Sequence, residues 1–409
     1  MSILFGLFAA FSITICLIFL LKPFALKVDL VDRPDSRKHH EGEIPLIGGL
    51  AIFMGFVGAL AVSGLITQIQ SVGIILAGLI LVATGLFDDY RSLSFRIKLV
   101  PQITAALIMV HLGGIYLQDL GGLSLDGSLF SLGDLAVPFT VFAAVGVINA
   151  INMSDGIDGL SGSLTLVALL GLSAVSFVHA REFELTTLLL LSSCVVGFLA
   201  FNISLPRRPK AVVFLGDVGS MFLGFVLAWF LIGLSQGESR AMSPVTALWF
   251  LAMPLFDTVG VMLRRILKKQ SPFLADREHF HHILLRGGYT VFQTHLIITS
   301  LALSFMAVGI FSSFYQISDL VMFGAFLGLF GLYFAGMMHA WKVMKFLRRN
   351  HNVVRFEVIL RGLGENDCRP SDETGHDCSG QAKPDTSLNL FSNPIGDRSP
   401  FEVCNLSRL

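Results

Sequence analysis

The chain has 409 residues, of which 54% are hydrophobic and only 14% are charged. Soluble globular domains carry about 25% charged residues, so this composition excludes that class and indicates an integral membrane protein. The formal net charge is zero. Because there is no excess of positive charge to attract a polyanion, we expect no nucleic acid among its partners.

Apolar runs of bilayer length recur along most of the chain. A helix needs about 20 apolar residues to cross the hydrocarbon core, so we predict an all-α integral membrane protein with about eleven transmembrane helices. The expected spans are residues 3–21, 46–65, 72–87, 97–117, 136–152, 160–180, 185–202, 211–234, 242–266, 293–315 and 317–342. We assign residues 1–350 to one polytopic transmembrane catalytic domain. Residues 351–409 are rich in Asp, Ser, Asn, Pro and Gly, and we predict a disordered cytoplasmic tail.

Lys and Arg are concentrated in every second loop. These loops are residues 22–45, 88–98, 203–210 and 264–292. The intervening loops offer only Arg181 and Arg240. The positive-inside rule therefore places the basic loops in the cytoplasm. The polar groups considered next lie at or near the inner ends of the spans, so we expect an active site that faces the cytoplasm.

In chain order, the first candidates are basic and acidic groups beside the second, third and fourth spans. Residues 37–40, which include Lys38, form a basic cluster that serves either orientation or attraction of a lipid phosphate. The third span ends in Asp88 and Asp89. Adjacent carboxylates are disfavoured at a helix C-terminus, so a divalent cation or a basic partner would stabilise them; a solvated helix end is the alternative. Lys98 begins the fourth span, where it could reach a phosphate.

The fifth span runs directly into a polar stretch, residues 149–160. Asn149, Asn152, Asp155 and Asp158 recur there at intervals of three, with two glycines among them. Polar groups against a bilayer-length helix are costly unless they have partners or a function. The stretch suits a phosphorylated, metal-bound ligand, although Ser, Asp and Gly also form ordinary turns.

The seventh and eighth spans add further candidates. Asn202 ends the seventh span, and Asp217 lies about 9 Å into the eighth at about 1.5 Å per residue. An unpaired buried carboxylate would take up a proton, so a bound metal is the natural way to keep Asp217 ionised. Mg²⁺, with Mn²⁺ as an alternative, suits a site shared with substrate phosphates. Phe214, one turn nearer the cytoplasm, either stacks on a nucleobase or packs in the core or against lipid.

The most basic loop contains the sequence Asp-Arg-Glu-His-Phe-His-His at residues 276–282. His279, His281 and His282, together with Arg277, could bind a diphosphate through charged hydrogen bonds. A zinc site is one alternative, but no cysteine is near to complete it. A solvated loop is the other alternative.

These blocks together resemble a known family. The sequence is similar to the polyprenyl-phosphate N-acetylhexosamine-1-phosphate transferases of the glycosyltransferase 4 type, and among them to the bacterial undecaprenyl-phosphate N-acetylglucosaminyl-1-phosphate transferases. The resemblance covers residues 1–345, and its seven blocks lie in residues 31–49, 85–89, 149–160, 201–202, 214–220, 254–257 and 271–282.

The resemblance implies an enzyme of the bacterial inner membrane. It would transfer N-acetylglucosamine 1-phosphate from UDP-N-acetylglucosamine to undecaprenyl phosphate and release UMP, the first lipid-linked step of a cell-surface polysaccharide such as O-antigen. The implied partners are the UDP-sugar, undecaprenyl phosphate and membrane lipid, and a homodimer is one assembly to test.

The resemblance also implies roles for the candidate residues. Asp217 would bind Mg²⁺, with Asn152 as a second ligand. Asp88 and Asp89 would be catalytic or orient the lipid phosphate. The other residues expected to serve catalysis are Asp155 and Asp158, which line the nucleotide pocket, and His279, His281 and His282. The residues expected to bind substrate are Lys38, Lys98, Asn149, Asn202, Phe214, which stacks the uracil, and Arg277.

Several alternatives stay open. Many relatives extend the acidic pair to Asp-Asp-x-x-Asp, whereas this chain has Ser92 at the last position. The lipid phosphate could attack directly, or the reaction could pass through an aspartyl intermediate. The donor could be another UDP-N-acetylhexosamine. A secondary transporter is the runner-up from a different class, since Asp257 in the ninth span resembles the midplane charges of transporters.

Overall fold

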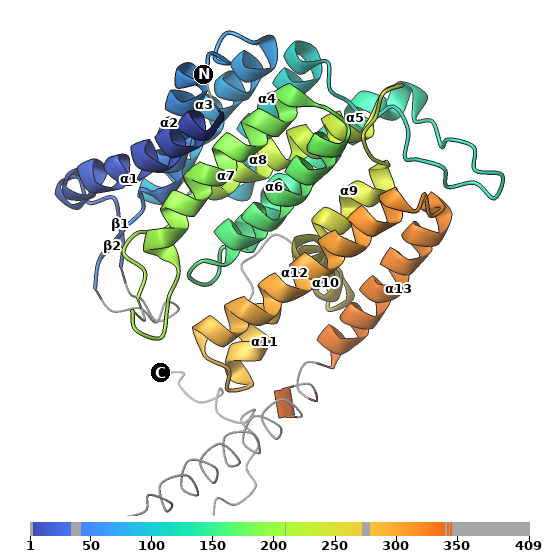
Figure 1. Cartoon of the computed structure of the whole chain (residues 1–409). Coiled ribbons are helices and arrows are strands. Elements are labelled where there is room, and N and C mark those ends of the chain that lie inside the picture. The colour runs from blue at the N-terminus through green and yellow to red at the C-terminus, as the bar shows by residue number, and fades with distance from the viewer. Residues whose placement is uncertain are drawn as a thin grey trace, which may run out of the picture. The chain divides into compact units, whose positions relative to one another are not determined.

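The structure of the chain is a computed structural model in which residues 3–33, 42–208, 210–271, 279–339, 342 and 344–345 are described. These residues form thirteen α-helices, one short 3-10 helix and a two-stranded antiparallel sheet (Figure 1). The predicted fold class, an all-α membrane protein, is therefore confirmed. The tail predicted at residues 351–409 lies outside the described residues.

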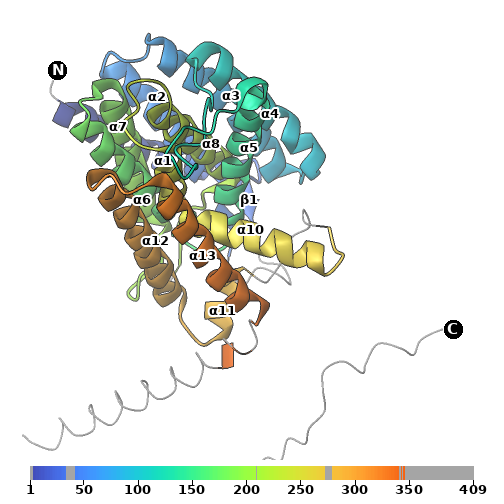
Figure 2. The same ribbon diagram turned by 90° about the vertical axis from the view of Figure 1, so that its right-hand side faces the viewer.

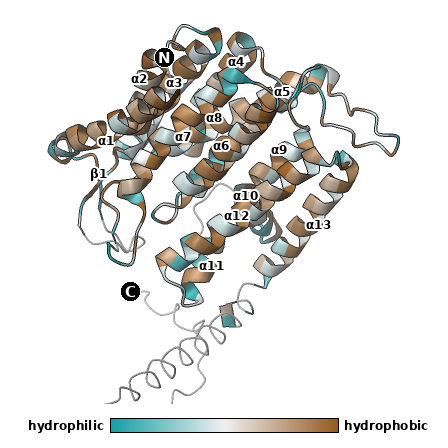
Figure 3. Ribbon diagram, in the orientation of Figure 1, coloured by the Kyte–Doolittle hydropathy of each residue, from teal (hydrophilic) through white to brown (hydrophobic). Residues whose placement is uncertain are grey.

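The elements in chain order are α1 (Ile3–Lys27), β1 (Val31–Asp32), β2 (Ile44–Pro45), α2 (Gly48–Val62), α3 (Ile69–Tyr90), α4 (Phe95–Gly113), η1 (Gly133–Leu135), α5 (Ala136–Met153), α6 (Leu160–Val178), α7 (Glu182–Asn202), α8 (Gly216–Ser235), α9 (Pro244–Phe250), α10 (Ala252–Leu267), α11 (Phe280–Arg286), α12 (Val291–Phe314) and α13 (Asp319–Met338). In the described part of the chain, nine helices are long and apolar enough to cross a membrane. The bent pair α9 and α10 makes a tenth span if it is counted as one, and α2 is apolar but has only 15 residues. Every predicted apolar run thus contains a helix, and hydrophobic residues dominate these helices (Figure 3).

Helix α8 lies at the centre of the helices α1 to α8. Nearly all of its residues are buried, and it packs against α2, α3, α5 and α6. Glycines allow the backbones to approach closely, as small residues do between membrane helices. A Cβ atom on Gly49 would overlap the backbone of Gly219, and a Cβ atom on Gly85 would lie 2.5 Å from the Cα atom of Val218. Backbone contact therefore fixes where α8 lies relative to α2 and α3.

The predicted ninth span, residues 242–266, is wrong as a single straight helix. It is broken into α9 and α10, which meet at an angle of 83°. Pro254 explains the break, because a proline cannot donate a backbone hydrogen bond and its ring clashes with the carbonyl four residues earlier. That carbonyl belongs to Phe250, the last residue of α9. As a result α10 projects away from the bundle, and α13 packs against both α9 and α10 (Figure 2).

The short hairpin of β1 and β2 fixes the point where the chain enters α8. The amide nitrogen of Phe214 donates to the carbonyl of Pro45 at 2.9 Å. In return, the amides of Gly48 and Gly49 donate to the carbonyls of Phe214 and Leu215, each at 2.9 Å. These bonds hold the first turn of α8, which carries Asp217, against the start of α2.

Candidate active site

The polar ends of four helices meet at one end of the bundle. Helix α3 packs against α4 and α8, and α5 packs against α4 and α8. Asp88 lies in the last turn of α3 and Lys98 in the first turn of α4. Asn152 lies in the last turn of α5 and Asp217 in the first turn of α8. The predicted convergence of these four residues is present.

Lys98 joins two of the carboxylates. Its ammonium nitrogen Nζ lies 2.6 Å from Oδ2 of Asp88 and 3.4 Å from Oδ2 of Asp217. The Asp88 side chain is only 4% exposed, whereas the Asp217 side chain is 30% exposed. The other oxygen of Asp88 accepts the backbone N–H of Leu93 at 2.6 Å. Asp88 is therefore satisfied at both oxygens, and Asp217 is the carboxylate that faces solvent.

Asn152 holds the other oxygen of Asp217. Its Nδ2 atom donates to Oδ1 of Asp217 at 2.6 Å and to the hydroxyl of Ser220 at 2.8 Å. One turn earlier on α5, Asn149 donates to the side-chain oxygen of Gln102 at 2.8 Å. Asn149 thus faces α4 and supports the packing beside Lys98. Ser220 and Gln102 were not predicted as site residues, although Ser220 follows Asp217 by three positions, which is one helical turn.

Asp89 closes the N-terminal end of α8. Its Oδ1 atom accepts the backbone N–H of Asp217 at 2.9 Å, and a negative charge is favoured at a helix N-terminus. Its Oδ2 atom is buried without a hydrogen-bond partner among the described groups. Gly216 makes this approach feasible, since its φ angle is +70° and a Cβ atom there would lie 2.6 Å from Oδ2 of Asp89. The two adjacent aspartates therefore occupy different environments.

The loop after α5 is tied to the segment before α8. Asn202 accepts the N–H of Gly159 at 2.8 Å and donates to the carbonyl of Val213 at 2.8 Å. Asp158 accepts the hydroxyl of Ser204 at 2.5 Å and the N–H of Ala211 at 3.2 Å. Asn202 thus uses both ends of its amide to hold the loop against the segment before α8, and its predicted contact with substrate stays a prediction.

Asp155 stands in a different position in the same loop. The residue is exposed, and neighbouring atoms displace part of the water around its carboxyl group. This loss of hydration, and then repulsion from Asp217 and Asp158, raise the pKa of Asp155 to about 8. Without a cation Asp155 is therefore mainly protonated near pH 7, and a nearby cation would stabilise its carboxylate form.

The histidine segment is held by Asp257 of α10. The Nδ1 atom of His279 lies 2.9 Å from Oδ2 of Asp257, and the N–H of Phe280 donates to Oδ1 at 2.9 Å. The hydroxyl of Tyr333 in α13 donates to the same Oδ1 at 2.8 Å. Tyr333 was not predicted, because no local pattern links it to residues 50 to 80 positions earlier. Asp257 was expected as part of the block at residues 254–257 and as a charge within a span, but not as a partner of the histidines.

His281 brings this segment to the loop after α5. A Cβ atom on Gly156 would overlap the imidazole ring of His281, so the glycine is needed for the ring to lie this close to the loop backbone. Burial lowers the pKa of His281 to about 3. The nearby His282 and His279 also lower this pKa, whereas the negative charge of Asp257 acts in the opposite direction. His281 is therefore neutral near pH 7. The rings of His281 and His282 have centroids 4.2 Å apart.

Three predicted site residues are not placed among these groups. Lys38 and Arg277 lie outside the described residues. Phe214 is partly buried, and its backbone bonds to Pro45 and Gly48 are described above. Its predicted stacking on a base stays a prediction.

Asp217 is the side chain in this cluster that best fits a divalent cation. Within the described residues, no three His, Cys, Asp or Glu side chains are grouped closely enough to hold a metal by themselves. Mg²⁺, however, commonly takes one or two protein oxygens and completes its shell with water and substrate phosphates. Asp217 meets that requirement, because it is partly exposed and its contact with Lys98 is long. The buried, unpaired Oδ2 atom of Asp89 is a further acceptor beside it.

Comparison with known proteins gives a consistent likeness. The family model for glycosyl transferase family 4 matches residues 71–235. The chain is 35% identical over 345 residues to the undecaprenyl-phosphate alpha-N-acetylglucosaminyl 1-phosphate transferase of Haemophilus influenzae. The aligned region covers 84% of this chain and 96% of that protein. The proteins of the same name from Salmonella typhi and Escherichia coli K12 are 36% and 34% identical, each over 84% of this chain and 93% of theirs. The family match contains Asp88, Lys98, Asn152 and Asp217.

Proposed function

The chain belongs to glycosyl transferase family 4 and, within it, to the undecaprenyl-phosphate alpha-N-acetylglucosaminyl 1-phosphate transferases. We therefore propose that it transfers N-acetylglucosamine 1-phosphate from UDP-N-acetylglucosamine to undecaprenyl phosphate. The chain is a sugar-1-phosphate transferase and a multi-pass membrane protein. The released product is UMP, and the active site faces the cytoplasm, where the positive-inside rule places the basic loops.

The observation that carries the proposal is the cluster of Asp88, Lys98, Asn152 and Asp217 at one membrane end of four helices. A lipid phosphate anchored in the bilayer presents its charge at this depth, just inside the helix ends. Phosphoryl transfer needs positioning and charge neutralisation more than covalent help from the protein. An ammonium group beside a partly exposed carboxylate supplies both a fixed positive charge and an oxygen able to share a cation with the substrate.

The reaction exchanges one phosphoanhydride bond for another. An oxygen of undecaprenyl phosphate forms a new bond to the phosphorus that carries the sugar. The bond between that phosphorus and the oxygen bridging it to uridylate breaks, and UMP leaves with the electron pair. No oxidant and no net proton source are needed, since the lipid phosphate enters as an anion and UMP leaves as one.

We favour direct attack by the lipid phosphate over an aspartyl intermediate, because the oxygens of Asp88 and Asp89 are hydrogen-bonded or buried. A nucleophilic carboxylate needs a free oxygen directed at the donor. Both oxygens of Asp88 accept hydrogen bonds, and Asp89 uses one oxygen on the N-terminus of α8 while the other is buried. We therefore give Asp88 the role of holding Lys98 and Asp89 that of orienting the first turn of α8.

Asp217, with the amide of Asn152 beside it, is the group we propose to hold Mg²⁺. When bound, the ion supplies positive charge to the diphosphate oxygens and to the departing uridylate. Asn152 fixes the Asp217 carboxylate through its 2.6 Å bond. Asp155 lies close enough to Asp217 for the two carboxylates to repel each other, and a bound cation would favour the carboxylate form of Asp155. His279, oriented by Asp257, is proposed to bind the diphosphate from the side of α11.

The proposal is tested with purified protein, undecaprenyl phosphate and radiolabelled UDP-N-acetylglucosamine. We expect label in the lipid fraction and an equal amount of UMP. Parallel reactions with UDP-N-acetylgalactosamine and UDP-glucose measure donor selectivity. Faster transfer from another donor would revise the substrate. Uptake of UDP-sugar into sealed vesicles without any lipid product would instead support a transporter and reject the proposed reaction.

A further inference from the structure

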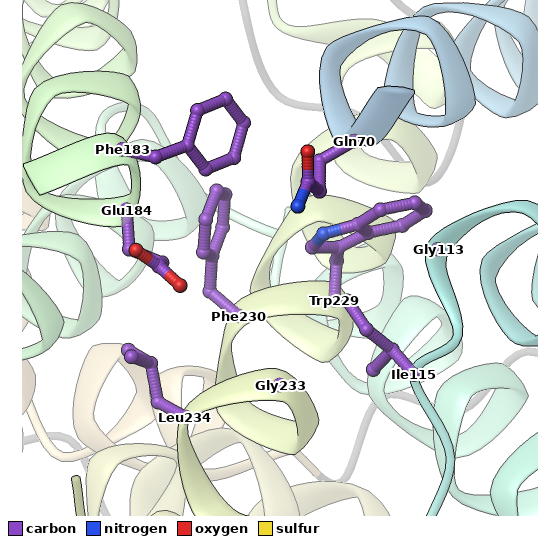
Figure 4. Close-up of a pocket in the computed structure, with 9 residues that line it drawn as sticks. All are labelled: Gln70, Gly113, Ile115, Phe183, Glu184, Trp229, Phe230, Gly233 and Leu234. Atoms are coloured by element: carbon purple, nitrogen blue, oxygen red, sulfur yellow. The ribbon is translucent and has the colours of Figure 1, made fainter. Parts of the chain in front are cut away.

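A cavity lies at the opposite end of the helices from Asp88, Asp89 and Asp217. It has a volume of about 120 Å³ and is lined by residues from α3, α4, α7 and α8 (Figure 4). Gln70, in the first turn of α3, precedes Asp88 by 18 positions, which corresponds to about 27 Å along the helix axis at about 1.5 Å per residue. The cavity is therefore separate from the transfer site and lies toward the other membrane face.

Aromatic rings form the wall of this cavity. Phe183, Trp229 and Phe230 all line it, and Figure 4 shows their rings around the same open space. Trp229 is held in a slot made by two glycines. A Cβ atom on Gly73 or on Gly113 would lie 2.7 Å from the Trp229 ring. The indole is thus fixed in place by close packing, and its position does not depend on a ligand.

The cavity also contains polar groups that lack partners. Glu184 and Gln70 line it, and neither side chain has a hydrogen bond or an ion pair within the described part of the chain. In the view of Figure 4 the Gln70 side chain lies next to Trp229, and the Glu184 carboxylate lies on the side of Phe230 away from Trp229. The two arginines near this end are already engaged. Arg181 donates to the hydroxyl of Ser239 at 2.9 Å, and Arg240 pairs with Asp119 at 3.3 Å.

We propose that this cavity binds a small organic ammonium ion, with the Glu184 carboxylate balancing its charge and the rings of Trp229 and Phe230 contacting its methyl or methylene groups. Aromatic faces attract cations, and aromatic cages with a nearby carboxylate recognise ammonium groups in other proteins. An anion would be repelled by the Glu184 carboxylate. The occupant is either a free solute or the amino headgroup of a lipid, since both present the same chemistry.

Choline is the probe for a direct binding measurement. Equilibrium dialysis of radiolabelled choline against the full-length protein in detergent should give saturable binding of one molecule per chain. The neutral isostere 3,3-dimethylbutan-1-ol should compete at least about tenfold more weakly, because it has the same shape and no charge. Absence of saturable choline binding, or equal competition by the isostere, overturns the proposal.

Two variants on the same helix separate the site from general effects. Glu184→Gln keeps the size of the side chain and removes its charge, so it should weaken choline binding at least about tenfold. Glu182→Gln, two positions earlier on an exposed side chain, should bind choline as the unchanged protein does. Both variants should transfer sugar phosphate at the normal rate, which shows that they are folded. Unchanged choline binding by Glu184→Gln overturns the assignment.

Lipid nanodiscs distinguish the two sources of the ammonium group. If the occupant is a headgroup, nanodiscs of phosphatidylethanolamine should suppress choline binding to the unchanged protein, and nanodiscs of phosphatidylglycerol should not. If the occupant is a free solute, choline should bind equally in both. Either outcome supports an ammonium site at Glu184.

Discussion

The Nδ1 atom of His279 lies 2.9 Å from Oδ2 of Asp257, and both residues are buried. This bond fixes which nitrogen of His279 faces the protein and leaves Nε2 on the other side of the ring. A carboxylate that orients a histidine through its far nitrogen is a common way to prepare the near nitrogen for ligand or metal. The hydroxyl of Tyr333 and the N–H of Phe280 complete the set of donors to Asp257.

Replacing Asp257 with Asn should therefore slow transfer. The amide cannot accept from all three donors or balance a charged imidazole, and we expect kcat to fall about 10- to 100-fold, as for other groups that orient a histidine. Tyr333→Phe removes one donor of three and should lower kcat less than about tenfold. Tyr315→Phe, on an exposed side chain, is the control. Equal kcat for Asp257→Asn and the unchanged protein would reject the orienting role.

Removing the charge of Lys98 should abolish activity. Lys98→Met leaves the buried carboxylate of Asp88 without its ion-pair partner and removes the positive charge beside Asp217. We expect kcat to fall by at least about 100-fold, the loss typical of removing a group that stabilises charge in the transition state. Arg96→Met, an exposed position two residues earlier, should be neutral. Transfer rates for both variants, with circular dichroism to verify folding, make the comparison.

Asp217 should control the response to divalent metal. Chelation should stop transfer, and Mg²⁺ or Mn²⁺ should restore it. Binding of Mn²⁺, followed by electron paramagnetic resonance, should weaken at least about tenfold in Asp217→Asn. Asp134→Asn, exposed and far along the chain in η1, is the matched control. Normal Mg²⁺-dependent transfer by Asp217→Ala would remove Asp217 as the metal ligand.

His281 should make stability depend on pH. Burial lowers the pKa of its imidazole to about 3, whereas an unfolded histidine titrates near about 6.5. Between these values the unfolded chain binds a proton that the folded chain does not, so stability falls as the pH drops below about 6.5. Between pH 7 and pH 5 the expected loss from this group is about 2 kcal/mol.

The measurement is the drop in apparent Tm between pH 7 and pH 5. His281→Gln should show a smaller drop than the unchanged protein, because the amide does not titrate. His111→Gln, on an exposed side chain, should retain the full drop. An identical pH response in the His281 variant would contradict the prediction.

Gly216 should be intolerant of a side chain. Its φ angle is +70°, and a Cβ atom there would lie 2.6 Å from Oδ2 of Asp89. Gly216→Ala should cost about 1–2 kcal/mol for the left-handed backbone alone, and it should also displace Asp89 and lower activity. Gly146→Ala, where a Cβ atom meets nothing within 4 Å, should be neutral or slightly stabilising because alanine favours helix. Apparent Tm and transfer rate report both effects.

Hydropathy predicted where the helices lie, and the loop charges indicated which of their ends carry the site. Both signals are local along the chain. The break at Leu251 was not predicted, because hydropathy does not indicate whether a helix bends. Pro254 was a usable signal, since a proline cannot bond to the carbonyl of Phe250 four residues earlier. The convergence of Asp88 with Asp217 was expected from helix ends, since successive spans return to the same membrane face.

The individual contacts could not be predicted in this way. Lys98 was expected to reach a phosphate, and in the structure its ammonium pairs with Asp88 and Asp217. Asn202 was expected to contact substrate; its amide bonds to the backbone of Gly159 and Val213, and a contact with substrate stays a prediction. Such choices depend on rotation of each helix about its axis, which no apolar run specifies. The pairing of Tyr333 with Asp257 depends on α13 lying beside α10, a relation set only by tertiary packing.

The close contacts of Gly49 with Gly219 and of Gly85 with Val218 mean that substitutions at these glycines can affect activity. The distance between the Asp217 carboxylate and the Lys98 ammonium depends on how closely α8 approaches α2 and α3. That approach is possible because Gly49 and Gly85 have no side chains. A single added methyl group at Gly49 or Gly85 would push α8 outward and separate the charged groups. Loss of activity can therefore arise in a variant whose polar residues are all unchanged, and screens confined to acidic and basic positions would miss it.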